Sequence, residues 1–204
     1  MLDNNDRQKI EQYIDKIINE INSDVNKNIK LGMSDRQIID KVVDLTVNRL
    51  TPESKMILSS TYNMLAENTL SSAKYYDIEK KATFYEMDIL KELNRKFNFE
   101  VKKNINYQES SKEINKWIKS GAVVILGGLI SVSLESAIPI GIPVIIAGIM
   151  VIVLKNTSTS GHKGVDSAIS EYLMNVKESI LLWITSIEEY YDASIDKLER
   201  EMNI

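Results

Sequence analysis

The sequence predicts an all-α protein, a bundle of long antiparallel amphipathic helices with one hydrophobic hairpin. Apolar residues recur every three or four positions along nearly the whole chain, as they do on one face of a helix. No segment alternates apolar and polar residues over a useful length, so strands are not expected. Residues 120–154 are almost uncharged, and they supply the hairpin.

The N-terminal part predicts two helices. The first covers residues 5–30 and ends before Gly32, and Ser34 caps the second, which runs to about Leu50. We expect a new helix at Thr51 and Pro52, because threonine is a good N-cap and proline is tolerated at the first helical position. The apolar stripe of the first helix comprises Ile10, Tyr13, Ile14, Ile17, Ile21, Val25 and Ile29, and that of the second Ile38, Ile39, Val42, Val43 and Leu50.

The next 46 residues, 52–97, predict either one long helix or two helices with a break near Ser71 and Ser72. Residues 98–108 are expected to form a loop, followed by a helix that begins at Ser110 or Ser111. The apolar face of residues 52–97 is expected to contain Tyr62, Leu65, Leu70, Tyr76, Phe84, Met87, Leu90 and Leu93.

A polar linker at residues 156–164 precedes the most regular predicted helix, at about 165–202. We therefore divide the chain into an amphipathic helical region (1–116), the hydrophobic hairpin (117–155), and the linker with the C-terminal helix (156–204), which is expected to pack on the N-terminal region. The apolar stripe of that helix comprises Ile169, Tyr172, Leu173, Val176, Ile180, Trp183, Ile184, Ile187, Tyr191, Ile195, Leu198 and Met202, and its exposed face is predicted to carry Glu178, Glu188, Glu189, Asp192, Asp196 and Glu199.

The hairpin consists of two uncharged runs, 120–134 and 136–154, separated by Glu135. Proline is poorly tolerated inside a helix, so Pro139, Gly141 and Pro143 mark the turn. A bilayer core takes about 20 helical residues. The second run is long enough, and the first becomes so if it includes Trp117 and Lys119 extends to the headgroups.

Basic residues flank both runs and are missing from the turn, so the positive-inside rule places both ends on one side of a membrane. Small residues on both runs permit close helix contact. The candidate insertion residues are Trp117, Gly121, Ile125, Gly127, Gly128, Leu129, Pro139, Gly141, Pro143, Ile146, Gly148, Ile152 and Leu154, and the candidate headgroup contacts are Lys112, Lys116, Lys119 and Lys155.

Composition excludes several kinds of chemistry. The chain has no cysteine and a single histidine, His162, so disulfides, thiolate catalysis and His-pair metal sites are excluded. Phosphate loops and nucleophile elbows are also missing, so we expect neither an enzyme nor a cofactor. The net charge of −4 gives no reason to expect nucleic acid as a partner. The N-terminus lacks a signal-peptide pattern, which predicts synthesis in the cytoplasm followed by membrane association or non-classical secretion.

Three smaller features have alternative interpretations. Glu188, Glu189 and Asp192 share a helical face that is either a cation site or, as we expect, a solvated acidic surface. His162 is either a pH sensor in a hinge or an ordinary loop residue. The tyrosine pairs at 75–76 and 190–191 are either membrane-interface aromatics or, as we expect, core and boundary residues.

Long amphipathic helices with one hydrophobic hairpin late in the chain resemble the α-helical pore-forming proteins. The order of helix 52–97, apolar tongue and helix 165–202 is similar to that of the cytolysin-A-type toxins, which include the haemolysin BL and non-haemolytic enterotoxin components. A hydrophobic hairpin wrapped by amphipathic helices resembles the colicin pore-forming domain. The chain is shorter than the first group, and it extends about 50 residues beyond the hairpin, unlike the second. The resemblance implies soluble-to-membrane conversion by insertion or oligomerisation, with residues 121–154 as the tongue.

The predicted function is therefore that of a membrane-active pore-forming or membrane-perturbing protein, whose soluble form shelters the hairpin. Its expected partners are a lipid bilayer and other helical subunits, in a homo- or hetero-oligomer. Two alternatives stay open. One is a resident two-span membrane protein with helical scaffold ends, and the other is a soluble helical-bundle interaction module with a buried apolar hairpin.

Overall fold

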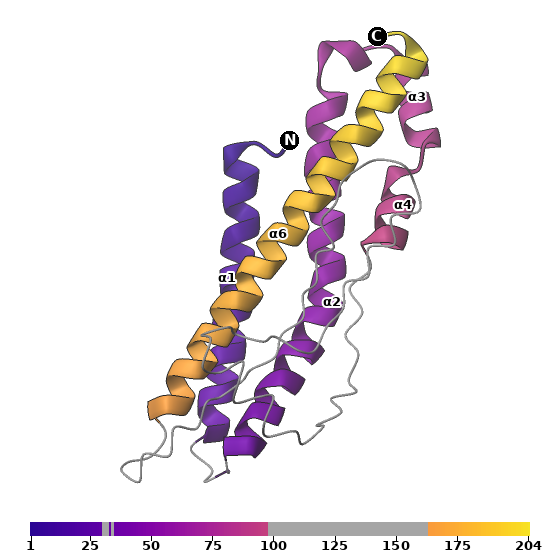
Figure 1. The fold of residues 1–204 in the computed structure, drawn as a ribbon. Coiled ribbons are helices and arrows are strands. Elements are labelled where there is room, and N and C mark those ends of the chain that lie inside the picture. The colour runs from indigo at the N-terminus through magenta and orange to yellow at the C-terminus, as the bar shows by residue number, and fades with distance from the viewer. Residues whose placement is uncertain (30–32, 34, 98–162) are drawn as a thin grey trace, which may run out of the picture.

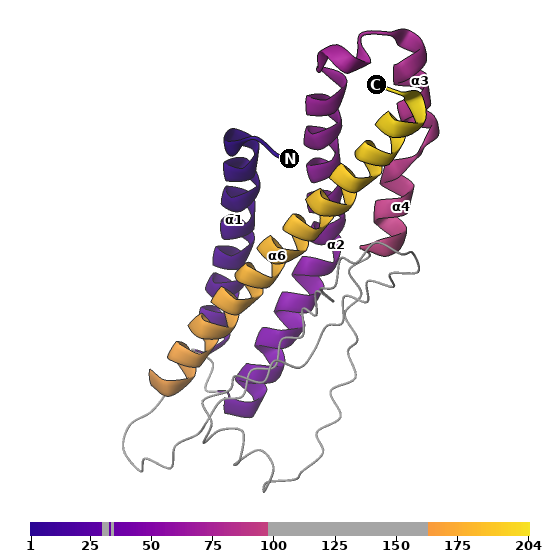
Figure 2. The same ribbon diagram turned by 45° about the horizontal axis from the view of Figure 1, so that its top comes forward.

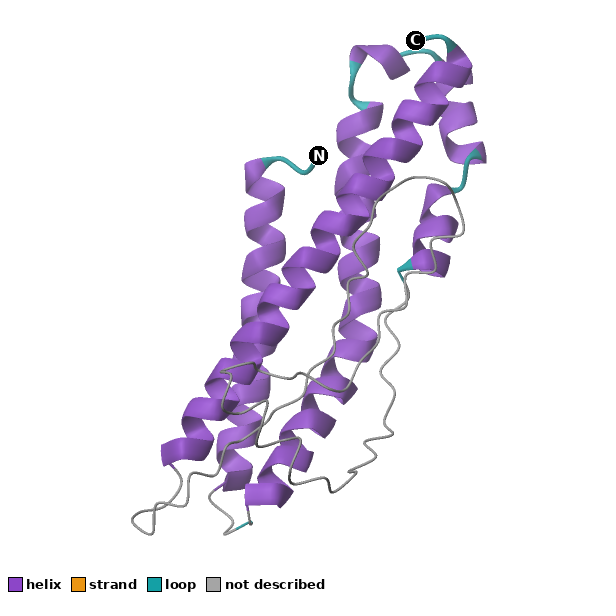
Figure 3. Ribbon diagram, viewed as in Figure 1, coloured by secondary structure: helices purple, strands orange, loops and turns teal. Residues whose placement is uncertain are grey.

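A computed structural model describes residues 1–29, 33, 35–97 and 163–204. Within these ranges all regular secondary structure is helical, as Figure 3 shows, and the predicted all-α class is confirmed. The predicted hairpin at residues 117–155 lies outside the described residues. The elements are α1 (Asn4–Ile29), α2 (Asp35–Leu70), the 3-10 turn η1 (Ala73–Tyr75), α3 (Ile78–Glu86), α4 (Ile89–Lys96) and α6 (Lys163–Met202).

Three long helices, α1, α2 and α6, lie side by side, and each contacts the other two (Figures 1 and 2). Glu20 of α1 pairs with Arg49 of α2, and Asp15 of α1 pairs with Lys177 of α6. α1 is antiparallel to both α2 and α6 (Figure 1). In contrast to the expected antiparallel arrangement, α2 and α6 run in the same direction, because both begin at the end of the bundle where α1 ends.

The described helices share one hydrophobic core. The predicted stripes on α1 and α6 face this core, because burying them against each other removes apolar surface from water. The stripes of the three long helices therefore cover one another. Contacts between this core and residues 117–155 lie outside the described residues. Its buried members from α1 are Ile10, Ile14, Ile17, Ile21 and Val25, and those from α6 are Ile169, Tyr172, Leu173, Val176, Ile180, Trp183, Ile184, Ile187, Tyr191, Ile195 and Leu198.

The predicted helix boundary at Thr51 and Pro52 is wrong, because α2 continues through Pro52 to Leu70. A proline inside a helix leaves the carbonyl four residues earlier without its partner. Here that carbonyl belongs to Asn48, and both Asn48 and Pro52 are exposed, so water can satisfy it. Buried side chains before and after the proline hold the two halves of α2 against the same core; they include Leu50, Ile57 and Leu58.

The predicted break near Ser71 and Ser72 is confirmed, since α2 ends at Leu70 and η1 follows. This turn changes the helical phase, so that Tyr75 is fully buried. Tyr76, which we placed on the apolar face, is 78% exposed, and that prediction is wrong.

A further break, between α3 and α4, was not predicted. It lies at Asp88, which adopts a left-handed conformation with φ 45°. Such a conformation is unusual for a residue other than glycine. The two resulting helices are only nine and eight residues long.

Candidate functional site

All of the predicted insertion and headgroup residues, from Lys112 to Lys155, lie outside the described residues, as does His162. Among the helices that are described, none combines the length and the apolar character that a membrane span requires. What the structure provides is the two points where the helical bundle joins residues 98–162.

The first junction, at the end of α4, is packed firmly onto α6. Phe97 is buried, and its ring meets that of Tyr190 edge-on, with 5.7 Å between centroids. The ammonium nitrogen of Lys96 lies 4.4 Å from the centroid of the same tyrosine ring. The backbone N–H of Phe97 donates to the carbonyl of Leu93 at 2.8 Å and continues the helical pattern up to the junction. The chain therefore leaves the bundle from a fixed position on α6.

The second junction is the start of α6 at Lys163, beside the C-terminal end of α1 and the N-terminal end of α2 (Figures 1 and 2). The end of α4 lies farther along the bundle, nearer to α3. Residues 98–162 thus connect two separate places on the helical scaffold.

One short stretch of α6, residues 187–192, contacts three other helices. Glu188 binds Arg7 of α1, Tyr190 packs against α4, and Tyr191 contacts α2. The hydroxyls of Tyr191 and Thr69 are 2.9 Å apart, and the ring of Tyr191 lies edge-on to that of Tyr62. Burial raises the pKa of Tyr191 above its ordinary value.

The expectation that Glu188 lies on the solvated acidic face is wrong, because its side chain is only 5% exposed. Nη2 of Arg7 donates to both carboxylate oxygens, at 2.9 and 2.7 Å. Sequence analysis missed this pair, although Glu188 follows the buried Ile184 by one helical turn, which is a sign of an inward position. Glu189 is exposed and Asp192 is partly exposed. No group of residues in the described ranges has the composition to bind a metal ion.

The tyrosine pairs behave differently from one another. Tyr75 and Tyr191 are buried and Tyr190 is partly buried, as core and boundary residues, whereas Tyr76 is exposed. The pairs therefore divide between the core and the surface.

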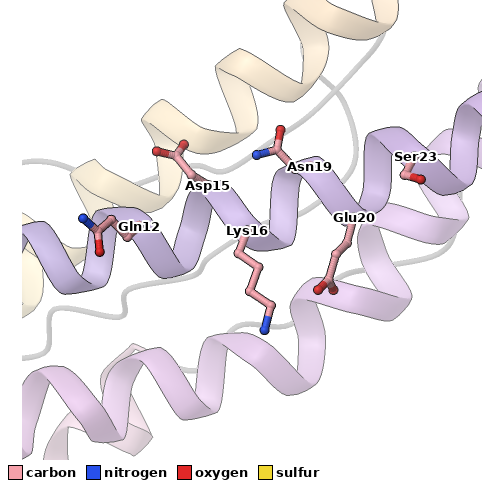
Figure 4. Close-up of a pocket in the computed structure, with 6 residues that line it drawn as sticks. All are labelled: Gln12, Asp15, Lys16, Asn19, Glu20 and Ser23. Atoms are coloured by element: carbon pink, nitrogen blue, oxygen red, sulfur yellow. The ribbon is translucent and has the colours of Figure 1, made fainter.

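A shallow hollow follows the outer surface of α1 (Figure 4). Asp15 extends toward α6, where it meets Lys177 at 2.5 Å, and Glu20 extends toward α2, where it meets Arg49. These charges already have partners on neighbouring helices, so the hollow offers no concentrated charge to a ligand. Its lining residues are Gln12, Asp15, Lys16, Asn19, Glu20 and Ser23.

Comparisons with protein-family models, with curated proteins and with solved structures found no match for this chain.

Proposed function

We propose that this chain is a membrane-active protein whose residues 117–155 enter a lipid bilayer as a helical hairpin. One observation carries the proposal: residues 120–154 contain a single charge, Glu135, in a chain of which 26% of the residues are charged. The second uncharged run, 136–154, has 19 residues, close to the length that crosses a bilayer core.

The packing of the bundle supports this proposal. The apolar stripes of α1, α2 and α6 are buried against one another in a shared core. A central hairpin is therefore not needed to explain why these helices are amphipathic. This favours a role for residues 120–154 outside the bundle over a role as its central element.

The attachment points suggest how the hairpin is carried. The bundle holds the chain at Phe97 and again from Lys163 onward, where α6 begins two residues earlier than predicted, while the polar stretches 98–110 and 156–162 act as hinges in our proposal. Burial of apolar surface in lipid supplies the driving force, at roughly 25 cal/mol per Å². Because one hairpin cannot enclose an aqueous channel, pore formation requires several chains to associate.

Leakage of a dye from anionic liposomes, at neutral and at acidic pH, tests the proposal. The full chain should release the dye, and Gly128→Asp should abolish release because it places a charge in the first apolar run. Gly161→Asp makes the same change in the polar linker and should leave release intact. Circular dichroism should give the same helix content for all three proteins. An absence of leakage by the wild-type chain at both pH values would refute the proposal.

A resident two-span membrane protein is the second candidate, because the same 19-residue run is long enough for permanent insertion. Fractionation separates the two. A resident protein stays in the membrane fraction until detergent is added, whereas the proposed protein is recovered in aqueous buffer and binds liposomes afterwards.

A further inference from the structure

A carboxylate is buried at the interface between α1 and α6. The Glu188 side chain is 5% exposed, whereas that of Arg7, its partner on α1, is 42% exposed. The two groups meet at 2.7 Å. One side of the pair thus lies inside the protein while the other remains in contact with water.

The charges around Glu188 do not compensate for its burial. On the α1 side, Arg7 and the amino group of Met1 favour the ionised carboxylate, and on α6 itself Asp192 disfavours it. The α2 residues around the neighbouring Tyr191 are Tyr62 and Thr69, and the α4 residue over Tyr190 is Lys96. Burial is the largest influence, and it raises the pKa of Glu188 above the ordinary 4.5. In buried ion pairs, the cost of removing the two charges from water often exceeds the energy of their mutual attraction.

We propose that Glu188 is a proton-binding site that regulates how firmly α1 is held against α6. Uptake of one proton removes a poorly hydrated charge from the interface and ends the repulsion by Asp192, which is four residues along the helix. Arg7 loses its ionic partner but remains hydrated, because it is partly exposed. Mild acidification therefore tightens the α1–α6 interface, and neutral pH leaves it at its weakest.

The direction follows from proton linkage. The folded protein holds the Glu188 proton more tightly than the unfolded chain does. The resulting stability is fully present below pH 4.5 and is lost as the pH rises through the raised pKa of the folded state. Since α1 packs on both α2 and α6, its release at neutral pH would uncover apolar stripes on both. This inference concerns the bundle in water, and it stands whether or not residues 117–155 enter lipid.

Hydrogen exchange of the full chain without lipid tests this site. Protection factors of α1 amides should rise, relative to those in Glu188→Gln, as the pH is lowered from 7.5 to 4.5, with a slope of up to about tenfold per pH unit once the pH is below the raised pKa of the folded state. Glutamine has nearly the shape of glutamate and can still accept a hydrogen bond from Arg7. Glu189→Gln is the matched control, because it removes the same charge from the adjacent exposed position. It should keep the pH dependence of the wild type.

A second variant keeps the test informative if Glu188→Gln folds poorly. Arg7→Gln leaves the buried carboxylate without its cation, so its protonation should begin at higher pH and the gain in α1 protection on acidification should be larger. The proposal is overturned if wild-type protection stays level or falls relative to Glu188→Gln. Equal loss of the pH dependence in Glu189→Gln would also overturn it. Both results are independent of the leakage experiment, which uses lipid.

Discussion

The two ends of the bundle have different kinds of core. Where α1, α2 and α6 run together, most of the buried side chains are aliphatic, with Ile14, Ile21 and Val42 among the most enclosed, and the buried rings of α6 here are those of Tyr172 and Trp183. Where α2 and α6 meet η1, α3 and α4 (Figures 1 and 2), aromatic rings pack edge-on against one another, among aliphatic side chains such as Ile89 and Leu93. These rings belong to Tyr62, Tyr75, Phe84, Phe97, Tyr190 and Tyr191.

The difference follows from helix length. The long helices have 26, 36 and 40 residues, and each repeats its apolar stripe over many turns. The buried side chains of any one turn therefore need to supply only a small part of the packing that stabilises the helix. α3 and α4 have nine and eight residues, which is too short for a stable isolated helix. Each of them is therefore held by very few buried side chains, α3 by the ring of Phe84 and α4 by Ile89, Leu93 and the ring of Phe97 at its end. We expect the aromatic end to depend on individual side chains more than the aliphatic end does.

The largest expected effect is that of Phe84→Ala. Phe84 is 1% exposed and is the buried anchor of α3, with its ring edge-on to those of Tyr75 and Tyr85. Its truncation should lower the free energy of unfolding by about 3–5 kcal/mol in urea titrations. Tyr85, at the next position, is 63% exposed, so Tyr85→Ala should lower the free energy of unfolding much less. Similar losses for both variants would contradict the idea of a single anchoring ring.

Pro52→Ala tests the aliphatic end, where the long helices should tolerate or benefit from local changes. Alanine restores the donor for the Asn48 carbonyl and removes the clash of the proline ring, so stability should rise by up to about 3 kcal/mol. Thermal unfolding measures the gain. A loss of stability would mean that a bend at Pro52 is required for α2 to reach both α1 and α6.

The same contrast explains how far sequence analysis succeeds. The 3.6-residue period predicts α1, α6 and their buried stripes, because many repeats agree with one another. It fails at Pro52, where packing on both sides outweighs a local stop signal. It also fails at Tyr76, where the three-residue turn η1 changes the helical phase, and at Asp88, where one left-handed residue separates α3 from α4. Neither place is marked by a proline or a glycine.

Of the features considered as functional sites, the sequence reveals one and not the other. The apolar run at 120–154 is evident from the sequence because it depends only on residue types in order. The Arg7–Glu188 pair joins residues 181 positions apart, so only the assembled fold brings it together. The helical period places Glu188 one turn after the buried Ile184 and so indicates that Glu188 is buried, but it does not identify Arg7 as its partner.

At the aromatic end, Tyr→Phe substitutions of two tyrosines should change the free energy of unfolding in opposite directions. Tyr75 is fully buried, and its hydroxyl has no hydrogen-bond partner among the residues that the structure describes, whereas the hydroxyl of Tyr191 bonds to that of Thr69. Tyr75→Phe should therefore raise the free energy of unfolding by about 1 kcal/mol, because it removes a desolvated group that gains nothing in return. Tyr191→Phe should lower it by about 1 kcal/mol through the lost hydrogen bond. Urea titrations of both variants give the comparison, and a shared sign would contradict it.

The smallest effect concerns the backbone between the two short helices. Asp88 has φ 45°, a conformation that costs glycine little, so Asp88→Gly should stabilise the protein by less than about 1 kcal/mol. Ala82→Gly, six residues earlier, lies in the middle of α3 and is also exposed, but it should destabilise by about 0.5–1 kcal/mol because the interior of a helix disfavours glycine. Thermal unfolding should place the two variants on opposite sides of the wild type. If both fall below it, the aspartate side chain itself stabilises the left-handed turn, and the aromatic end then depends on this residue as well as on its rings.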